Sequence, residues 1–407
     1  MKPLIAIVLF ASLVTTSCKS INKPNSETSF DGGEHKVLGD TGYKQACSEY
    51  GTVCPALIYR ADRKDSFSYG ELVAFSGDFY GTPEEIITQT RNQSFLHPFS
   101  PNDKRVKGYF EKEEAAILKQ MSDPNVSYPD YNLGFGFSFP KYLELSTTNY
   151  NHFGWFNMVF YVKYHGRALA LAVQAHDETD AKKKDSLLNQ ALIVNAFSDH
   201  FLTDGFATGH IRNPRTQAVE WQKKYKYNKI AVDALAKLMH DHDHLLKDSH
   251  GPGLAVKNTR GDQWHTRCDG ELFVLATAQS PQVAIPIESV ARSVKELMTA
   301  YREGQTPIGL YSATELVPFL DTTETALVDV FKPDIPHDQI IAWLKSLGIL
   351  YKAGIFYDLN ESMARTFFAA LPGIMDNFRA EVTKEAQDPE IAKRLPDAYI
   401  KGFETIR

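Results

Sequence analysis

Apolar residues recur along much of this chain at the three- and four-residue spacing of an α-helix. Helices are expected over residues 80–120, 156–174, 185–203 and 216–246. Pro83 and His97 followed by proline break the first of these stretches. Two-residue alternation is scarce, and a short strand is expected only near residues 254–256. The pattern therefore predicts an all-α fold.

The helical spacing continues in the last third of the chain, where prolines interrupt it. It runs from residue 285 onward, and the interruptions fall at Pro333, Pro336, Pro372 and Pro389. There is no internal repeat. We therefore expect residues 276–407 to form a helical C-terminal region, and nothing in its sequence indicates a role.

Residues 1–17 are typical of a secretory signal, because an apolar run over positions 4–14 follows a basic residue and precedes small residues. Cys18 stands where a bacterial lipoprotein carries its lipidated cysteine, although Thr15 departs from the usual Leu or Val three residues earlier. Ordinary export with cleavage near Ser17 is the alternative. Residues 18–33 are polar and fit a flexible tether. We expect an exported protein, either a lipoprotein anchored in the outer membrane or a secreted one.

The remaining cysteines and the charge bear on compartment and partners. An exported protein can form disulfides, and Cys47 and Cys54 are candidates for a short-loop bridge. Cys268 would then be left over, and the sequence does not establish which two of the three pair. The formal charge of −6 gives no basic patch, so duplex nucleic acid is not an expected partner.

A metal-binding pattern lies at the end of the helix expected over residues 185–203. His200, Asp204 and His210 form the pattern H-x3-D-x5-H. Residues four apart share a helix face, so His200 and Asp204 can hold one ion together. Gly205 and Gly209 would let the helix end and bring His210 back toward the same centre. Two imidazoles and a carboxylate are ligands of hydrolytic zinc sites, so the pattern predicts a metal-dependent hydrolase.

Further histidines and acids could complete such a site. Spacings of three and four place His240, Asp243 and His244 on one helical face, although a His- and Asp-rich helix end can simply be solvated. The remaining candidates come earlier in the chain. They are His35, Asp78 and His152. Each of these is weak alone, and their order along the chain is what makes them informative.

This ordered series resembles the bacterial zinc-dependent phospholipases C, whose fold is shared with the zinc single-strand nucleases. The residues that carry the resemblance are His35, Asp78, His152 followed by Phe, the His200–Asp204–His210 segment, and His240 with its neighbours. Residues 70–83 and 210–214 are most similar to the branch of the family found in Pseudomonas and Legionella. The similarity covers residues 34–272, and we expect residues 34–275 to form the catalytic domain.

The resemblance implies a multi-helix fold that holds up to three zinc ions. His35, His152, His200, Asp204, His210 and His240 would be ligands, and Asp78 would bridge metals and act as the general base or orient the nucleophilic water. Clustered zinc ions suit phosphodiester cleavage, because they acidify a bound water and stabilise the leaving alkoxide. The implied activity is a phospholipase C acting on phosphatidylcholine-like lipids, with the membrane surface as its substrate.

Two departures from the family pattern leave the metal count at two or three. The free amine of the family's mature N-terminus completes one zinc site, and acylation of Cys18 would block it, so Glu34 or water would have to substitute. The family's last ligand is a carboxylate four residues after the histidine. That position here is His244, and Asp243 precedes it. An exported single-strand nuclease and a non-enzymatic zinc-binding lipoprotein are the alternative functions.

Overall fold

A computed structural model describes most of the chain after its first 31 residues. The described residues are 32–51, 54–62, 65–88, 102–129, 131, 134–135, 138–139, 141–142, 145, 148, 150–245, 247–248, 251–268, 270–323, 331–347 and 359–406. The signal, Cys18 and most of the expected tether lie outside them. The structure is 66% helical and 5% strand, which confirms the all-α class.

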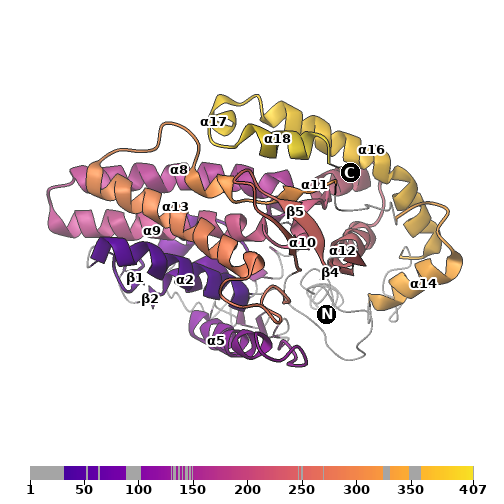
Figure 1. Ribbon diagram of the computed structural model, residues 1–407, viewed down its shortest axis with the longest axis horizontal. Helices are drawn as coiled ribbons and strands as arrows, with labels where there is room; N and C mark the ends of the chain where they lie inside the picture. The colour runs from indigo at the N-terminus through magenta and orange to yellow at the C-terminus, as the bar shows by residue number, and fades with distance from the viewer. Residues whose placement is uncertain are drawn as a thin grey trace, which may run out of the picture.

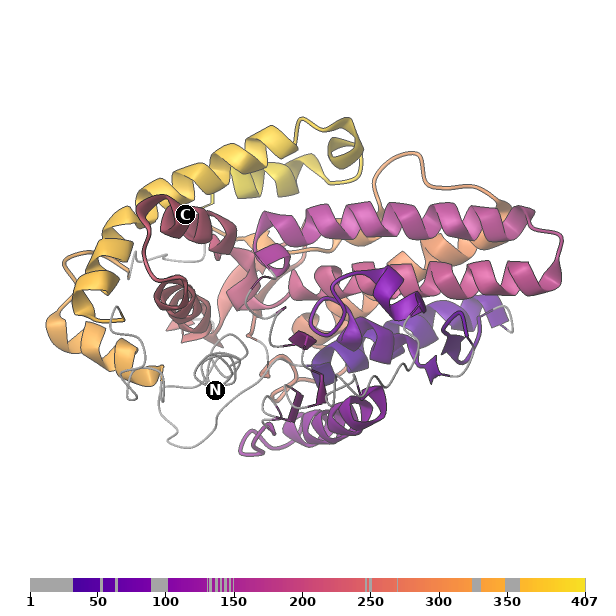
Figure 2. The same ribbon diagram turned by 180° about the vertical axis from the view of Figure 1, so that it is seen from behind.

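Four long helices lie side by side and form the body of the molecule (Figures 1 and 2). They are α2 (Gly32–Tyr50), α8 (Trp155–Asp177), α9 (Ala181–Asp204) and α13 (Pro281–Glu303). The side chain of Asp180 caps α9 by accepting hydrogen bonds from the backbone N–H groups of residues 182 and 183. From residue 191 to its end, every residue of α9 is buried. A helix buried on all sides lies in the core, so its last turns carry their polar side chains into the interior.

Shorter elements surround this bundle. They are β1 (Ile58–Tyr59), β2 (Ser66–Phe67), α3 (Tyr69–Phe75), α4 (Pro83–Thr88), α5 (Asp103–Gln120), η2 (Tyr150–His152), α10 (Thr208–Ile211), α11 (Arg215–Tyr225), α12 (Lys229–Leu245), β3 (Lys247–Asp248), β4 (Gly251–Pro252), β5 (Leu254–Lys257), β6 (Gln263–Thr266), η3 (Ser312–Glu315), β7 (Phe319–Leu320), α14 (His337–Ser346), α16 (Glu361–Glu385), α17 (Pro389–Ala392) and α18 (Asp397–Glu404). The strand expected near residue 255 is β5, the middle strand of an antiparallel sheet with the order β6-β5-β7.

Two expectations about helix boundaries were wrong in detail. The single helix expected over residues 216–246 is two helices, because Lys226 adopts a left-handed conformation with φ of 59° and ends α11. Gly32 and Gly33 belong to α2 and are buried, so the helix begins inside the segment expected to be a tether.

The C-terminal region packs into the same structure. Helix α13 contacts α2, α8 and α9, and the main core extends to Ile406. A second, smaller core joins α11 and α12 to α14 and α16. The expected boundary at residue 275 therefore does not coincide with a break in the packing.

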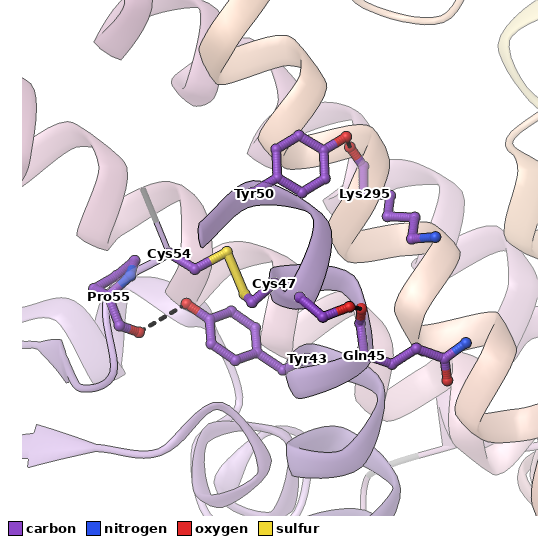
Figure 3. Close-up of a disulfide and its surroundings, with 8 residues drawn as sticks. Tyr43, Gln45, Cys47, Tyr50, Cys54, Pro55 and Lys295 are labelled. Atoms are coloured by element: carbon purple, nitrogen blue, oxygen red, sulfur yellow. Dashed lines mark hydrogen bonds between the residues drawn. A yellow bond between two sulfur atoms is a disulfide. The ribbon is translucent and has the colours of Figure 1, made fainter. Parts of the chain in front are cut away.

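A disulfide between Cys47 and Cys54 links the last turn of α2 to the segment that follows it (Figure 3). Beside it, the Tyr43 hydroxyl donates a hydrogen bond of 2.8 Å to the carbonyl of Pro55. No described cysteine is a free thiol, so Cys268 is also disulfide-bonded instead of being left over. Among the described residues, none of the helices combines the length and hydrophobicity needed to cross a membrane.

Candidate metal centre

Six of the predicted ligands converge where α9 ends, although they come from five segments. They are His35 in α2, Asp78 after α3, His152 in η2, His200 and Asp204 in α9, and His210 in α10. All six side chains are buried. Two groups of three have their ligand atoms within 4.8 Å of one another. They are His35–His200–Asp204 and Asp78–His152–His200. His200 belongs to both, so the two groups adjoin.

Two of these histidines, His35 and His200, form a hydrogen bond through Nδ1, and that bond sets the tautomer of the ring. His200 Nδ1 lies 3.0 Å from the carbonyl oxygen of Val73, which can only accept, so Nδ1 carries the proton. His35 Nδ1 lies 2.7 Å from the Thr203 hydroxyl, which itself donates to the backbone carbonyl of Asp199. In the neutral rings, Nε2 of His35 and of His200 therefore presents a lone pair. Metal-binding histidines are oriented by outer partners of this kind.

These lone pairs face carboxylate oxygens. His35 Nε2 lies 3.5 Å from Asp204 Oδ1, and His200 Nε2 lies 3.7 Å from Asp204 Oδ2 and 3.9 Å from Asp78 Oδ2. His152 Nδ1 is 2.8 Å from Asp204 Oδ2 and 3.1 Å from His200 Nε2. The His152 Nδ1–H group donates to Asp204, but the lone pairs of the other two rings and the carboxylate oxygens still outnumber the donors, and a cation would relieve the repulsion between these acceptors.

Burial determines the charge of the centre. It lowers the pKa of His152 and lowers that of His200 well below its ordinary value, so both rings are neutral near pH 7. Burial alone would raise the pKa of Asp204, but the imidazoles of His152, His200 and His210 offset it and hold this pKa well below its usual range. A buried carboxylate among neutral rings leaves negative charge, and buried charge is normally paired or bound to metal. The centre could therefore hold a metal ion.

Gly77 gives Asp78 its place beside the histidines. Its φ is +73°, and a Cβ added there would lie 2.7 Å from His200 Nε2 and 2.8 Å from His152 Cε1. A side chain at this position would thus be strained and would also displace two rings. The loop can approach the centre closely because residue 77 is glycine.

His210 joins the centre by a route different from the one expected. Gly205 has a right-handed φ of −59°, so the chain turns without using the conformational freedom of glycine. The short helix α10 then carries His210, whose Nδ1 donates to the carbonyl of His152 at 2.8 Å and lies 3.6 Å from Asp204 Oδ1. A Cβ on Gly209 would come within 2.1 Å of the His240 ring, so this glycine provides space.

His240, a predicted ligand from the last part of the series, lies beside this centre. The His240 ring is 5.2 Å from that of His210, but His240 belongs to neither group of three. Both carboxylate oxygens of Asp243 accept hydrogen bonds from Arg212, a partner for which the sequence carries no signal. The side chain of His244 lies outside the described residues.

Glu34, considered above as a substitute ligand, anchors the start of α2. Its two oxygens accept hydrogen bonds of 3.0 Å from the backbone N–H groups of Gly270 and Leu272. This contact fixes the first turn of α2, and with it the position of His35.

No protein-family model matches this chain, and no curated protein or solved structure matches it.

Proposed function

We propose that this protein is a zinc-dependent phosphodiester hydrolase, and specifically a phospholipase C that cleaves phosphatidylcholine-like lipids to diacylglycerol and a phosphorylated head group. The observation that carries the proposal is the buried, acceptor-rich centre, in which His200 Nε2 faces Asp78 and Asp204. Imidazole nitrogens and carboxylate oxygens are the ligand set of hydrolytic zinc sites. The choice of a phospholipid rests on the resemblance of residues 70–83 and 210–214 to that family.

The chain's own groups have distinct roles in this proposal. When bound, zinc would acidify a coordinated water and polarise a phosphoryl oxygen. Asp78, held by the turn at Gly77, would orient the attacking water or accept its proton. The Val73 carbonyl and the Thr203 hydroxyl would keep the rings of His200 and His35 in their metal-binding orientation.

The proposal includes export of the protein. The disulfide between Cys47 and Cys54 supports an oxidising compartment. Once exported, the enzyme would meet its substrate at a membrane surface.

Metal analysis combined with activity tests the proposal. Purified protein should contain zinc and release nitrophenol from p-nitrophenylphosphocholine, whereas single-stranded DNA should stay intact. His200→Ala and Asp204→Ala should each lose at least about 100-fold in rate, the scale of removing one electrostatic contributor. His337→Ala is the matched control, because that ring is 65% exposed and lies outside the centre. Full activity in the first two variants, or cleavage of DNA alone, would overturn the proposal.

A further inference from the structure

A pocket of about 380 Å³ lies between α12 and α16. Its walls are largely apolar, with Met239 from α12 and Phe368, Leu371 and Met375 from α16. The volume is at the lower end of the roughly 300–1,000 Å³ of small-molecule sites. Such a pocket is suited to a slender apolar ligand.

The bend of α16 shapes this pocket. Pro372 lies inside the helix and has no N–H group, so it cannot donate to the carbonyl of Phe368 one turn earlier. The helix curves accordingly where it passes α12 and α14 (Figures 1 and 2). Both residues line the pocket, so the proline lies where α16 forms the pocket wall.

Two residues of the pocket wall follow closely on histidines at or beside the candidate metal centre. Arg212 in its wall follows His210 by two residues, and Asp243 follows His240 by one helical turn. The rings of these two histidines are 5.2 Å apart. A molecule with its phosphate at the metal centre would therefore have an apolar site close to its reacting group.

Charged groups in the pocket lining favour an amphiphile with an anionic head. Arg212 is paired with Asp243, and Arg379 donates to Asp376 and to the backbone carbonyl of Ile406. Lys332 also lines the pocket, is exposed, and forms no ion pair within the described part of the chain. An apolar interior with basic groups in its lining suits an alkyl chain attached to a phosphate better than a fully polar ligand.

We propose that this pocket binds one acyl chain of the lipid whose phosphodiester is cleaved at the metal centre. The proposal rests on the proposed function and adds a chain-recognition site in the C-terminal region. It predicts that residues of α12 and α16 determine the preference for acyl-chain length, because a longer acyl chain buries more methylene groups against these helices.

The experiment compares monomeric dibutyroyl- and dihexanoyl-phosphatidylcholine as substrates. Burying one methylene group favours binding about fourfold, so two on one chain should raise kcat/KM by about 15-fold in the wild type. Ala369 is exposed and lines the pocket, so Ala369→Trp should remove this gain. Ala380→Trp is the matched control, since Ala380 is exposed on the same helix outside the pocket lining, and it should keep the gain. Melting temperature checks the folding of both variants.

Further arms separate failure of the pocket from failure of the proposed function. Hydrolysis of p-nitrophenylphosphocholine, which has no acyl chain, should be equal in all three proteins. Equal hydrolysis of that ester with the chain-length gain intact in Ala369→Trp would overturn the pocket and leave the proposed function standing. If none of the proteins hydrolyses the ester, the proposed function fails.

A binding measurement tests the pocket whether or not the protein hydrolyses the ester. Ala369→Trp should weaken the binding of dodecylphosphocholine, measured by calorimetry, at least tenfold, and unchanged binding would overturn the pocket. The pocket proposal would also be overturned if Ala369→Trp weakened the binding of dodecanoate or of single-stranded DNA but left the dependence of kcat/KM on acyl-chain length unchanged.

Discussion

Adding a single methyl group at Gly77 should disrupt the metal centre from outside its ligand set. In Gly77→Ala the new Cβ would stand 2.7 Å from His200 Nε2 and 2.8 Å from His152 Cε1, far inside van der Waals contact. The rings must move or the loop carrying Asp78 must retreat. Because φ is +73° at this position, the substitution also adds about 1–2 kcal/mol of backbone strain.

Gly51→Ala separates the two effects. Gly51 has a similar φ of +60°, but a Cβ there meets nothing within 4 Å. Both variants should lose about 1–2 kcal/mol of unfolding free energy from backbone strain. Only Gly77→Ala should weaken zinc binding, by about 10–100-fold, the scale measured when groups that orient metal ligands are lost.

The assay is competition for zinc with a chromogenic chelator, together with denaturant unfolding of the metal-free proteins. Wild-type zinc affinity and activity in Gly77→Ala would refute the close approach of the Asp78 loop to the two rings. Equal loss of affinity in Gly51→Ala would show that general destabilisation, and not displacement of the rings, is the cause.

Three further predictions concern single contacts. Thr203→Val removes the acceptor of His35 Nδ1 and should weaken zinc binding about 10–100-fold in the same competition assay, with the fold retained in circular dichroism. Replacing Cys47 and Cys54 by serine opens a loop with a sequence separation of 7 and should cost about 2–3 kcal/mol in denaturant unfolding, with zinc content unchanged. Burial alone would raise the pKa of Glu296, but an imidazole and a backbone N–H donate to it and lower its pKa. Its contribution to stability is therefore complete above the unfolded-state pKa of about 4.3 and is lost as the pH falls through the folded-state value. Glu296→Gln should flatten that part of a melting-temperature profile recorded from about pH 6 to pH 3, and an unchanged slope would contradict the assignment.

The sequence pattern was sufficient for the helices but not for their boundaries or neighbours. The spacing of apolar residues indicates α8 and α9, because a buried helix needs them on most turns. It did not indicate the break at Lys226, where the residue type is ordinary and the left-handed conformation decides. Nor did it reveal that α13 belongs to the main core, since periodicity identifies a buried face without identifying what covers it.

In the candidate site, too, the sequence predicts the arrangement of residues on one helix but not the contacts between distant segments. His200 and Asp204 are four residues apart on one helix, so their common orientation follows from the sequence. The Thr203 hydroxyl and the Val73 carbonyl, which set the tautomers, have no sequence signal of their own. The pairing of Asp243 with Arg212 likewise depends on the packing of α10 against α12.

Zinc content per chain tests the central claim most directly, because His200 belongs to both groups of candidate ligands. Plasma mass spectrometry of protein purified without added metal should find two or three zinc ions in the wild type and in His337→Ala. His200→Ala should lose at least one ion together with its activity. A wild-type protein that is free of metal yet hydrolyses p-nitrophenylphosphocholine, or a His200→Ala variant with full zinc content and full activity, would contradict the account.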